Sequence, residues 1–438
     1  MSNRPAFAPL TRRRGRRALL GAGIAVIIAG GGAVGAALWG CFIRSEQAAP
    51  SGPPTPVPLN AVATQPTDRQ LWPRLAARLA EQEPAVQLAP EVIRLNDVAP
   101  RLAGGEAASL LAVPDSRVTQ LAATGSLATT ADLLRGRNAP TRDEFVHRLF
   151  GALSLEGVLY GLPWRWRGVA LLLDSAAWQR AELELPPDHW RDDRWSLAAM
   201  ETALARFQEL AATGDPGPPP FRGGTRWSDW LPWLWLNDAA LWRHGATATA
   251  LTEPAAVTAL QSYAEWRTTP RPAPGNAGAI VMVEPTWRTV GQALKAGQVA
   301  YPLPRGVWRT TLLRSEALLL TGAAAQPDAA RRALVALATD AGQEIVAADG
   351  AGFPVWRATL AGRTLWEQWR ETPRLVRALR TFIETGTYGA VPPYPSRWPE
   401  AERVLNRELG PALDGHAPVA AVVQSAAAAL APFLAASR

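Results

Sequence analysis

The chain has 438 residues, which is too long for one compact core, and its 48% hydrophobic and 19% charged residues are typical of a globular protein. Its formal net charge of +7 comes from the N-terminal tail, because residues 1–41 contain six arginines and no acidic residue, which leaves 39 basic and 38 acidic residues in the remainder. Because the rest of the chain is nearly neutral, its charge does not indicate a nucleic-acid partner.

The first 41 residues have the order of an export signal. A basic segment at Arg12–Arg17 precedes 22 uncharged residues, and Gly40 then stands before Cys41. The end of this segment resembles a bacterial lipobox, which implies that Cys41 is lipidated, and Arg16–Arg17 resembles a twin-arginine signal. An uncleaved transmembrane helix is the alternative, since the apolar stretch is long enough to cross a bilayer. Both interpretations place the rest of the chain outside the cytoplasm, anchored to the membrane.

Strands and helices are predicted to alternate after the anchor. Residues 42–58 are rich in proline and predict a semi-extended tether. Residues 59–64 predict a first strand, residues 67–84 an amphipathic helix, and residues 108–116 a buried strand that ends in a loop. This alternation is typical of βαβ units with a parallel sheet. Ligands of such sheets lie beyond the carboxyl ends of the strands, so Asp115 is a candidate ligand-binding residue unless it only forms the turn.

Later segments carry short motifs in a fixed order. The most specific one lies in residues 155–190, where G-x-L-Y-G-x-P is followed by an apolar strand and P-x-x-W. Related motifs lie in residues 110–134, 251–267, 279–297, 323–360 and 413–434. In this order the six segments resemble the sugar-type (family 1) extracellular solute-binding proteins of ABC transporters, in their lipoprotein form.

The resemblance implies an α/β fold of the two-lobed periplasmic-binding-protein type, class II-like, in which each lobe is a sheet flanked by helices. Residues 59–167 plus about 316–340 would form lobe 1, and residues 168–315 plus about 341–438 would form lobe 2. Hinge strands would join the lobes at residues 166–173, near 311–320 and near 338–343.

The nineteen tryptophans suggest how a ligand is held. An indole ring suits the apolar face of a sugar, and arginine supplies oriented donors. The candidate ligand-binding residues are Asp115, Trp164, Arg165, Trp166, Trp227, Trp230, Trp233, Glu284, Trp287, Trp356 and Arg357. Either Trp164 or Trp166 could instead belong to a core, and Trp235 and Trp242 are expected there. Arg165, Arg167, Arg288 and Arg357 would equally suit an acidic sugar or a phosphorylated polyol.

We therefore expect the substrate-binding component of an ABC importer, which captures a carbohydrate or related polar solute by hinge closure. Its partners would be that solute, the permease and the lipid bilayer, with no nucleic acid. No nucleophile, phosphate-binding or dinucleotide motif stands in the right context, so we expect no enzyme, no catalytic residue and no cofactor. A single cysteine and four scattered histidines predict no metal site. The alternatives are an envelope sensor or scaffold without transport, and a secreted glycoside hydrolase, which would need two facing carboxylates.

Overall fold

The computed structural model describes residues 56–105, 108–213, 220–243, 246–268, 279–284, 286, 290–292, 294, 297–324, 327–367 and 373–434. The predicted signal, Cys41 and most of the tether lie outside this part. The chain from Pro54 to Arg438 forms one compact unit, in which the buried side chains gather into two hydrophobic cores, each beside one sheet. Among the described residues, no helix is both long and apolar enough to span a membrane.

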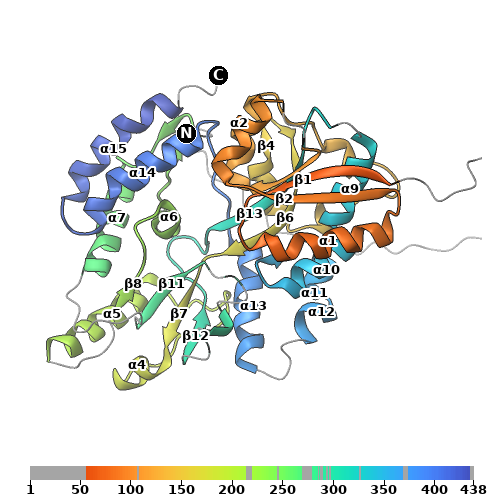
Figure 1. Ribbon diagram of the computed structural model, residues 1–438. Coiled ribbons are helices and arrows are strands. Elements are labelled where there is room, and N and C mark those ends of the chain that lie inside the picture. Colours follow the sequence, from red (N-terminus) through yellow and green to blue (C-terminus); the bar gives the residue numbers. More distant parts are fainter. Residues whose placement is uncertain are drawn as a thin grey trace, which may run out of the picture. The chain divides into compact units, whose positions relative to one another are not determined.

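A mixed sheet of six strands carries the first core (Figure 1). Its strands in spatial order are β14 (Phe353–Pro354), β6 (Gly161–Gly168), β13 (Leu313–Leu320), β3 (Leu110–Pro114), β1 (Val57–Ala63) and β2 (Val86–Val92). β1 pairs in parallel with β2 and β3, as predicted, whereas β13 runs antiparallel to β3 and β6. Every residue of β3 is buried, because helices and loops cover both faces of this strand.

Short helices surround the first sheet. They are α1 (Asp68–Gln82), α2 (Val98–Ala103), α3 (Val118–Ala123), α9 (Pro327–Ala338), α10 (Asp340–Asp349), α11 (Arg357–Ala361), α12 (Arg363–Glu367) and α13 (Pro373–Tyr388). Single turns of 3-10 helix lie at Leu95–Asp97, Asp115–Arg117, Ala131–Leu134 and Arg142–Glu144, and a longer 3-10 helix lies at His147–Leu153. A small hairpin joins β4 (Ser154–Leu155) to β5 (Val158–Leu159). The predicted first helix is confirmed as α1, whose Leu71, Leu75 and Leu79 are buried on one face.

A four-stranded sheet carries the second core. Its strands in spatial order are β12 (Gln298–Tyr301), β7 (Ala170–Asp174), β11 (Ile280–Val283) and β8 (Phe221–Arg222). The helices beside it are α4 (Ser175–Arg180), α5 (Leu197–Ala212), α6 (Trp227–Leu236), α7 (Pro254–Thr268), α14 (Trp398–Leu413) and α15 (Val419–Leu434), and β9 (Trp242–Arg243) pairs with β10 (Ala248–Thr249). Leu171 and Leu173 of β7 belong to the second core and Leu172 to the first, so this strand contributes to both.

Three segments cross between the cores side by side. β6 continues into β7 through Val169, whose N–H donates to the carbonyl of Leu312 (3.0 Å). The amide of Ala390 donates to the carbonyl of Thr311, and the amide of Leu313 donates to the carbonyl of Ala390, both at 2.8 Å. The first two crossings coincide with predicted hinges. The third predicted hinge is wrong, because residues 338–343 form the junction of α9 and α10 inside the first core. The segment at Ala390 makes the third crossing instead.

The division of the chain after residue 340 also differs from the prediction. Buried residues of α10 to α13, from Ala341 to Phe382, belong to the first core, although we assigned this region to lobe 2. The cause is β14, which pairs with β6 through Phe353 and Trp166 and so brings the helices around it against the first sheet. We therefore revise our proposed boundaries to 59–168 plus 313–388 for lobe 1, and to 169–312 plus 390–434 for lobe 2.

Candidate ligand-binding site

Carboxylates lie at the carboxyl ends of two strands of the first sheet. The chain leaves β1 and reaches Asp68 at the start of α1, and it leaves β3 directly into Asp115. Asp115 Oδ2 accepts hydrogen bonds from the amide (2.8 Å) and the hydroxyl (2.9 Å) of Ser315 in β13. Burial raises the pKa of Asp115 to about 6, although these hydrogen bonds act to lower it. Asp115 thus lies at the predicted edge, where it ties β3 to β13.

A buried ion triad lies beneath this edge. Arg165 Nη2 lies 2.6 Å from Asp68 Oδ1 and 2.6 Å from Glu316 Oε2, and each of the three side chains is at most 5% exposed. Arg165 and Glu316 face each other across β6 and β13, so the strand register brings them together. Burial raises the pKa of Asp68 to about 6 against the attraction of Arg165, which lowers it. Removing Arg165 would leave two buried carboxylates without a cation, at a cost of about 3–5 kcal/mol, so the triad supports the architecture of the site.

Three half-buried charges lie at the crossing strands, and we call them the hinge cluster: Arg167, Glu284 and Arg314. Arg314 Nη1 lies 3.0 Å from Glu284 Oε2, and Arg167 Nε lies 3.6 Å from Glu284 Oε1. The side chains of Arg167, Glu284 and Arg314 are 27%, 19% and 29% exposed. Glu284 follows β11 of the second sheet, whereas Arg167 and Arg314 belong to β6 and β13 of the first. The hinge cluster therefore combines groups from both lobes at a partly open position.

Aromatic residues of the second lobe border the hinge cluster. The guanidinium of Arg314 lies 5.6 Å from the ring centre of Trp227, and the indole N–H of Trp227 donates to Glu402 (2.9 Å). Glu284 raises the pKa of Arg314, which fixes its positive charge. Among the described residues, neither Glu284 Oε1 nor the buried hydroxyl of Tyr394 has a hydrogen-bond partner. Buried polar atoms are normally paired, so these two indicate a place for water or for a ligand hydroxyl.

Most of the predicted indole platform lies inside the cores, contrary to our expectation. Trp164 and Trp166 are buried in the first core, where Trp164 packs on Trp72 (5.3 Å between ring centres) and Trp166 packs on Phe353 (5.3 Å). The indole N–H of Trp166 donates to the carbonyl of Pro354. The cause is that α1 covers Trp164 and β14 covers Trp166, so β6 has no open face here.

The α6 wall is also buried. Trp227, Trp230 and Trp233 are at most 2% exposed, and Trp233 lies 5.1 Å from Trp266 of α7. Of these three, only Trp227 has a ring contact with the hinge cluster among the described residues. A helix that is apolar on every side is normally buried, so the composition of α6 already carried this signal.

The remaining predicted residues divide between several places. Trp356 is 7% exposed in the first core, and its N–H donates to Asp340 (2.8 Å). Arg357 is exposed at the start of α11, and Trp287 and Arg288 lie outside the described residues. Glu284 stands in the hinge cluster, and Arg165 stands in the triad beside it.

Sequence reasoning missed three charged residues of the site. Asp68, Arg314 and Glu316 have no role in the prediction. Arg314 and Glu316 lie within β13, whose sequence LRSEALLL is otherwise apolar except for Ser315. Charges inside an apolar strand are costly unless they are paired, and this was the available signal.

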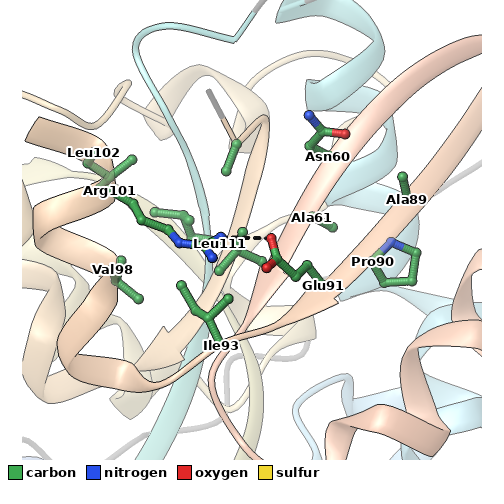
Figure 2. A pocket seen from close by; sticks show the side chains of 12 residues that line it. Asn60, Ala61, Ala89, Pro90, Glu91, Ile93, Val98, Arg101, Leu102 and Leu111 are labelled. Carbon is green, nitrogen blue, oxygen red and sulfur yellow. Dashed lines mark hydrogen bonds and ion pairs between the residues drawn. The ribbon is translucent and has the colours of Figure 1, made fainter. Parts of the chain in front are cut away.

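A cavity of about 530 Å³ lies elsewhere, between β1, β2 and α2 (Figure 2). Arg101 and Glu91 form an ion pair across it (2.8 Å), and most of its other lining residues are apolar. All of its lining residues belong to lobe 1, so closure of the lobes would not enclose a ligand there. A smaller cavity of about 260 Å³ lies between Arg117 of lobe 1 and Glu400 and Arg403 of α14, and so has walls from both lobes. No cluster of metal-ligating side chains occurs within the described ranges.

Comparison with solved structures finds proteins of similar fold. No protein-family model and no curated protein sequence matches the chain. The sugar-binding protein MalE from Xanthomonas citri has a similar structure, with a TM-score of 0.73 and 14% identity over 86% of this chain and 98% of that chain. The substrate-binding protein Lmo0181 from Listeria monocytogenes, solved with cycloalternan, gives a TM-score of 0.70 and 14% identity over 86% and 98% of the two chains. The cyclic α-maltosyl-1,6-maltose binding protein from Arthrobacter globiformis gives a TM-score of 0.69 and 17% identity over 87% of this chain and 100% of that chain. The chain therefore has the two-lobed α/β fold of the sugar-binding solute-binding proteins of ABC transporters, as the sequence predicted.

Proposed function

We propose that this protein is the extracytoplasmic substrate-binding component of an ABC importer and that it captures a carbohydrate or a related polar solute. The hinge cluster carries this proposal, because Arg167 and Arg314 of one lobe meet Glu284 of the other beside the crossing strands. The similar structures are of a substrate-binding protein bound to cycloalternan, a cyclic α-maltosyl-1,6-maltose binding protein and a sugar-binding protein, which are binding proteins rather than enzymes. We infer no catalysis.

The chemistry of the hinge cluster suits a polyhydroxylated ligand. Guanidinium groups donate to hydroxyl oxygens, and Oε1 of Glu284, which has an ion-pair contact with Arg167 but no hydrogen bond, can accept a hydroxyl hydrogen. Contacts with both lobes would give the closed state a higher ligand affinity than the open state, so a solute would shift the population toward closure.

The N-terminal segment supplies the proposed location. Its basic, apolar and cysteine-ended order favours export and anchoring through a lipid on Cys41. Anchoring would hold the protein near the permease that receives the solute. We expect a fatty-acid analogue to label the wild type but not Cys41→Ser, and equal labelling of both would contradict lipidation.

Calorimetric titration tests the proposed function. The purified protein is titrated with neutral mono- and disaccharides and with their uronic-acid and phosphate derivatives. We expect at least one carbohydrate to bind, and Arg314→Gln to weaken it by about tenfold or more, since one charge-assisted contact is typically worth about 1.4 kcal/mol or more. The absence of binding by every compound would contradict the proposed function.

A further inference from the structure

We propose that the solute carries a carboxylate or a phosphate group, and that this group binds between Arg167 and Arg314. This inference rests on the proposed function and adds the charge of the ligand. It would make the protein selective for acidic or phosphorylated carbohydrates over their neutral counterparts.

Charge balance in the hinge cluster is the first argument. Within the described part of the chain, two half-exposed guanidinium groups share one half-exposed carboxylate, Glu284. Glu316 is the second acid within reach of Arg167, at 3.8 Å, but it is 5% exposed and lies 2.6 Å from Arg165. Glu316 is thus shared between Arg165, which also pairs with Asp68, and Arg167. The positive excess lies only among the partly exposed side chains, where Arg167 and Arg314 face the single carboxylate of Glu284.

Strand geometry is the second argument. Arg167 and Arg314 stand directly opposite each other in the antiparallel pair of β6 and β13. Like charges in this position repel each other, and one carboxylate at 3.6 Å and 3.0 Å compensates only part of that repulsion. Each guanidinium has five N–H donors in a planar fork that matches an oxyanion, so a second anion can bind beside Glu284.

Preorganisation is the third argument. The ring of Trp227 lies against the guanidinium of Arg314, and its own N–H is held by Glu402. A fixed guanidinium loses less conformational entropy when it binds an anion than a free one does. The side chain of Arg314 is therefore positioned before the ligand arrives.

Glu284 distinguishes an anionic ligand from a neutral one. If an oxyanion binds both arginines, Glu284 repels it, so Glu284→Gln should tighten binding by about threefold or more. If a neutral sugar binds instead, Glu284 accepts its hydroxyl hydrogens, and Glu284→Gln should weaken binding.

The experiment is calorimetric titration of the full chain with matched probes. The first set is glucose, glucuronate and glucose 6-phosphate. The second set is the neutral sugar that binds most tightly in the titration described above, together with its uronic-acid and phosphate derivatives. We expect an anionic probe to bind at least about tenfold more tightly than its neutral partner, and the wild-type affinity for it to fall as salt rises from about 50 to 500 mM. Arg167→Gln and Arg314→Gln should weaken the anionic probe, Arg314→Lys should retain part of the affinity, and Arg78→Gln should change nothing. Arg78 is the matched control, because it forms an exposed ion pair with Glu81 on α1.

Two results overturn the inference. Equal or tighter binding of the neutral probes would refute the charge of the ligand and leave the proposed function standing. Weaker binding of the anionic probe by Glu284→Gln would do the same. Binding of neither kind of probe would refute the proposed function itself. The salt dependence needs no variant, so the test holds even if a substitution prevents folding.

Discussion

Two kinds of charged residue meet at the site. Asp68, Arg165 and Glu316 are buried and form two ion pairs, which join α1, β6 and β13 into one support. Arg167 and Arg314 are half exposed, and they keep the capacity to contact a solute. A substitution in the first set is therefore expected to affect folding, and one in the second set to affect binding.

Asp115 gives a prediction about pH. Its pKa in the folded protein is about 6, above its ordinary value of 3.8, so the folded state holds the proton more tightly than the unfolded state. The stability that this proton contributes is fully present below about pH 4 and is lost as the pH rises through 6. Asp115→Asn imitates the protonated form. The free energy of unfolding of the wild type should therefore fall relative to that of Asp115→Asn, by up to about 3 kcal/mol, between pH 4 and 7.

Denaturant unfolding of both proteins at four pH values across this range checks the prediction. Asp68→Asn is a useful comparison, because burial also raises the pKa of Asp68 to about 6 and Arg165 keeps its ion pair with Glu316 in this variant. The wild type should therefore lose stability relative to Asp68→Asn over the same pH range. A difference between the wild type and Asp115→Asn that is constant with pH would show that the carboxyl of Asp115 is not perturbed by burial.

The position of Asp115 could be predicted from the sequence, because the buried run of β3 ends visibly at Pro114. The triad of Asp68, Arg165 and Glu316 could not be predicted in this way. Arg165 meets Asp68 across 97 residues of sequence and Glu316 across 151, and no local pattern carries information over such separations. The strand register of β6 and β13 decides which charges meet.

Among the helices and strands, our main wrong prediction concerned α6. Its tryptophans stand one helical turn apart, which suggested a wall facing a ligand. In the structure α6 packs against α7, α14 and the second sheet, so its indoles are buried on more than one side. Periodicity shows which residues share a face, but a helix with apolar residues all round has no face to assign.

Trp230 therefore tests the corrected role of α6. Trp230→Ala removes a fully buried indole from the second core and should lower the free energy of unfolding by about 3–5 kcal/mol, with little change in ligand affinity among folded molecules. Trp235 on the same helix is only partly buried, so Trp235→Ala should cost clearly less. Chemical denaturation and calorimetry on the same preparations measure both quantities. Equal stability of the two variants, or a loss of affinity specific to Trp230→Ala, would restore the platform hypothesis.

The amphipathic pattern of α1 and the continuous apolar run of β3 predicted both elements correctly, whereas β14 was not anticipated. β14 has only two residues, too few to show a periodicity, yet its pairing with β6 moves α10 to α13 into the first core. The error in the lobe boundary thus follows from one short contact between distant segments.

At the scale of the whole molecule, two cores and three crossing segments explain how a site can open and close. The crossings share hydrogen bonds between Val169 and Leu312 and between Thr311 and Ala390, so they would bend together. At Gly168 a β-carbon would collide with the side chain of Thr385 in α13, which explains why a glycine stands where β6 enters the crossing. Bending here would move the second sheet, with Glu284, relative to the first.

The overall fold followed from the order of motifs, since six weak segments in sequence constrain one another. The crossing at Ala390 could not be predicted from these motifs, because no apolar strand marks it and only the single residue Ala390 pairs with Leu312. Crossing segments are defined by contacts between distant residues, which a single sequence does not display.

We propose that a solute bound at the hinge cluster draws the two lobes together. Spin labels on two introduced cysteines measure this directly in a Cys41→Ser background. One is at Arg78→Cys on α1, where the native side chain is 43% exposed, and one is at Gln424→Cys, an exposed position on α15. Pulsed electron paramagnetic resonance then gives the distribution of distances between the lobes without and with saturating carbohydrate. We expect the distribution to become narrower and to shift to shorter distances with the solute, and Arg314→Gln to suppress this shift. A distribution that stays the same while calorimetry shows the carbohydrate bound would contradict it.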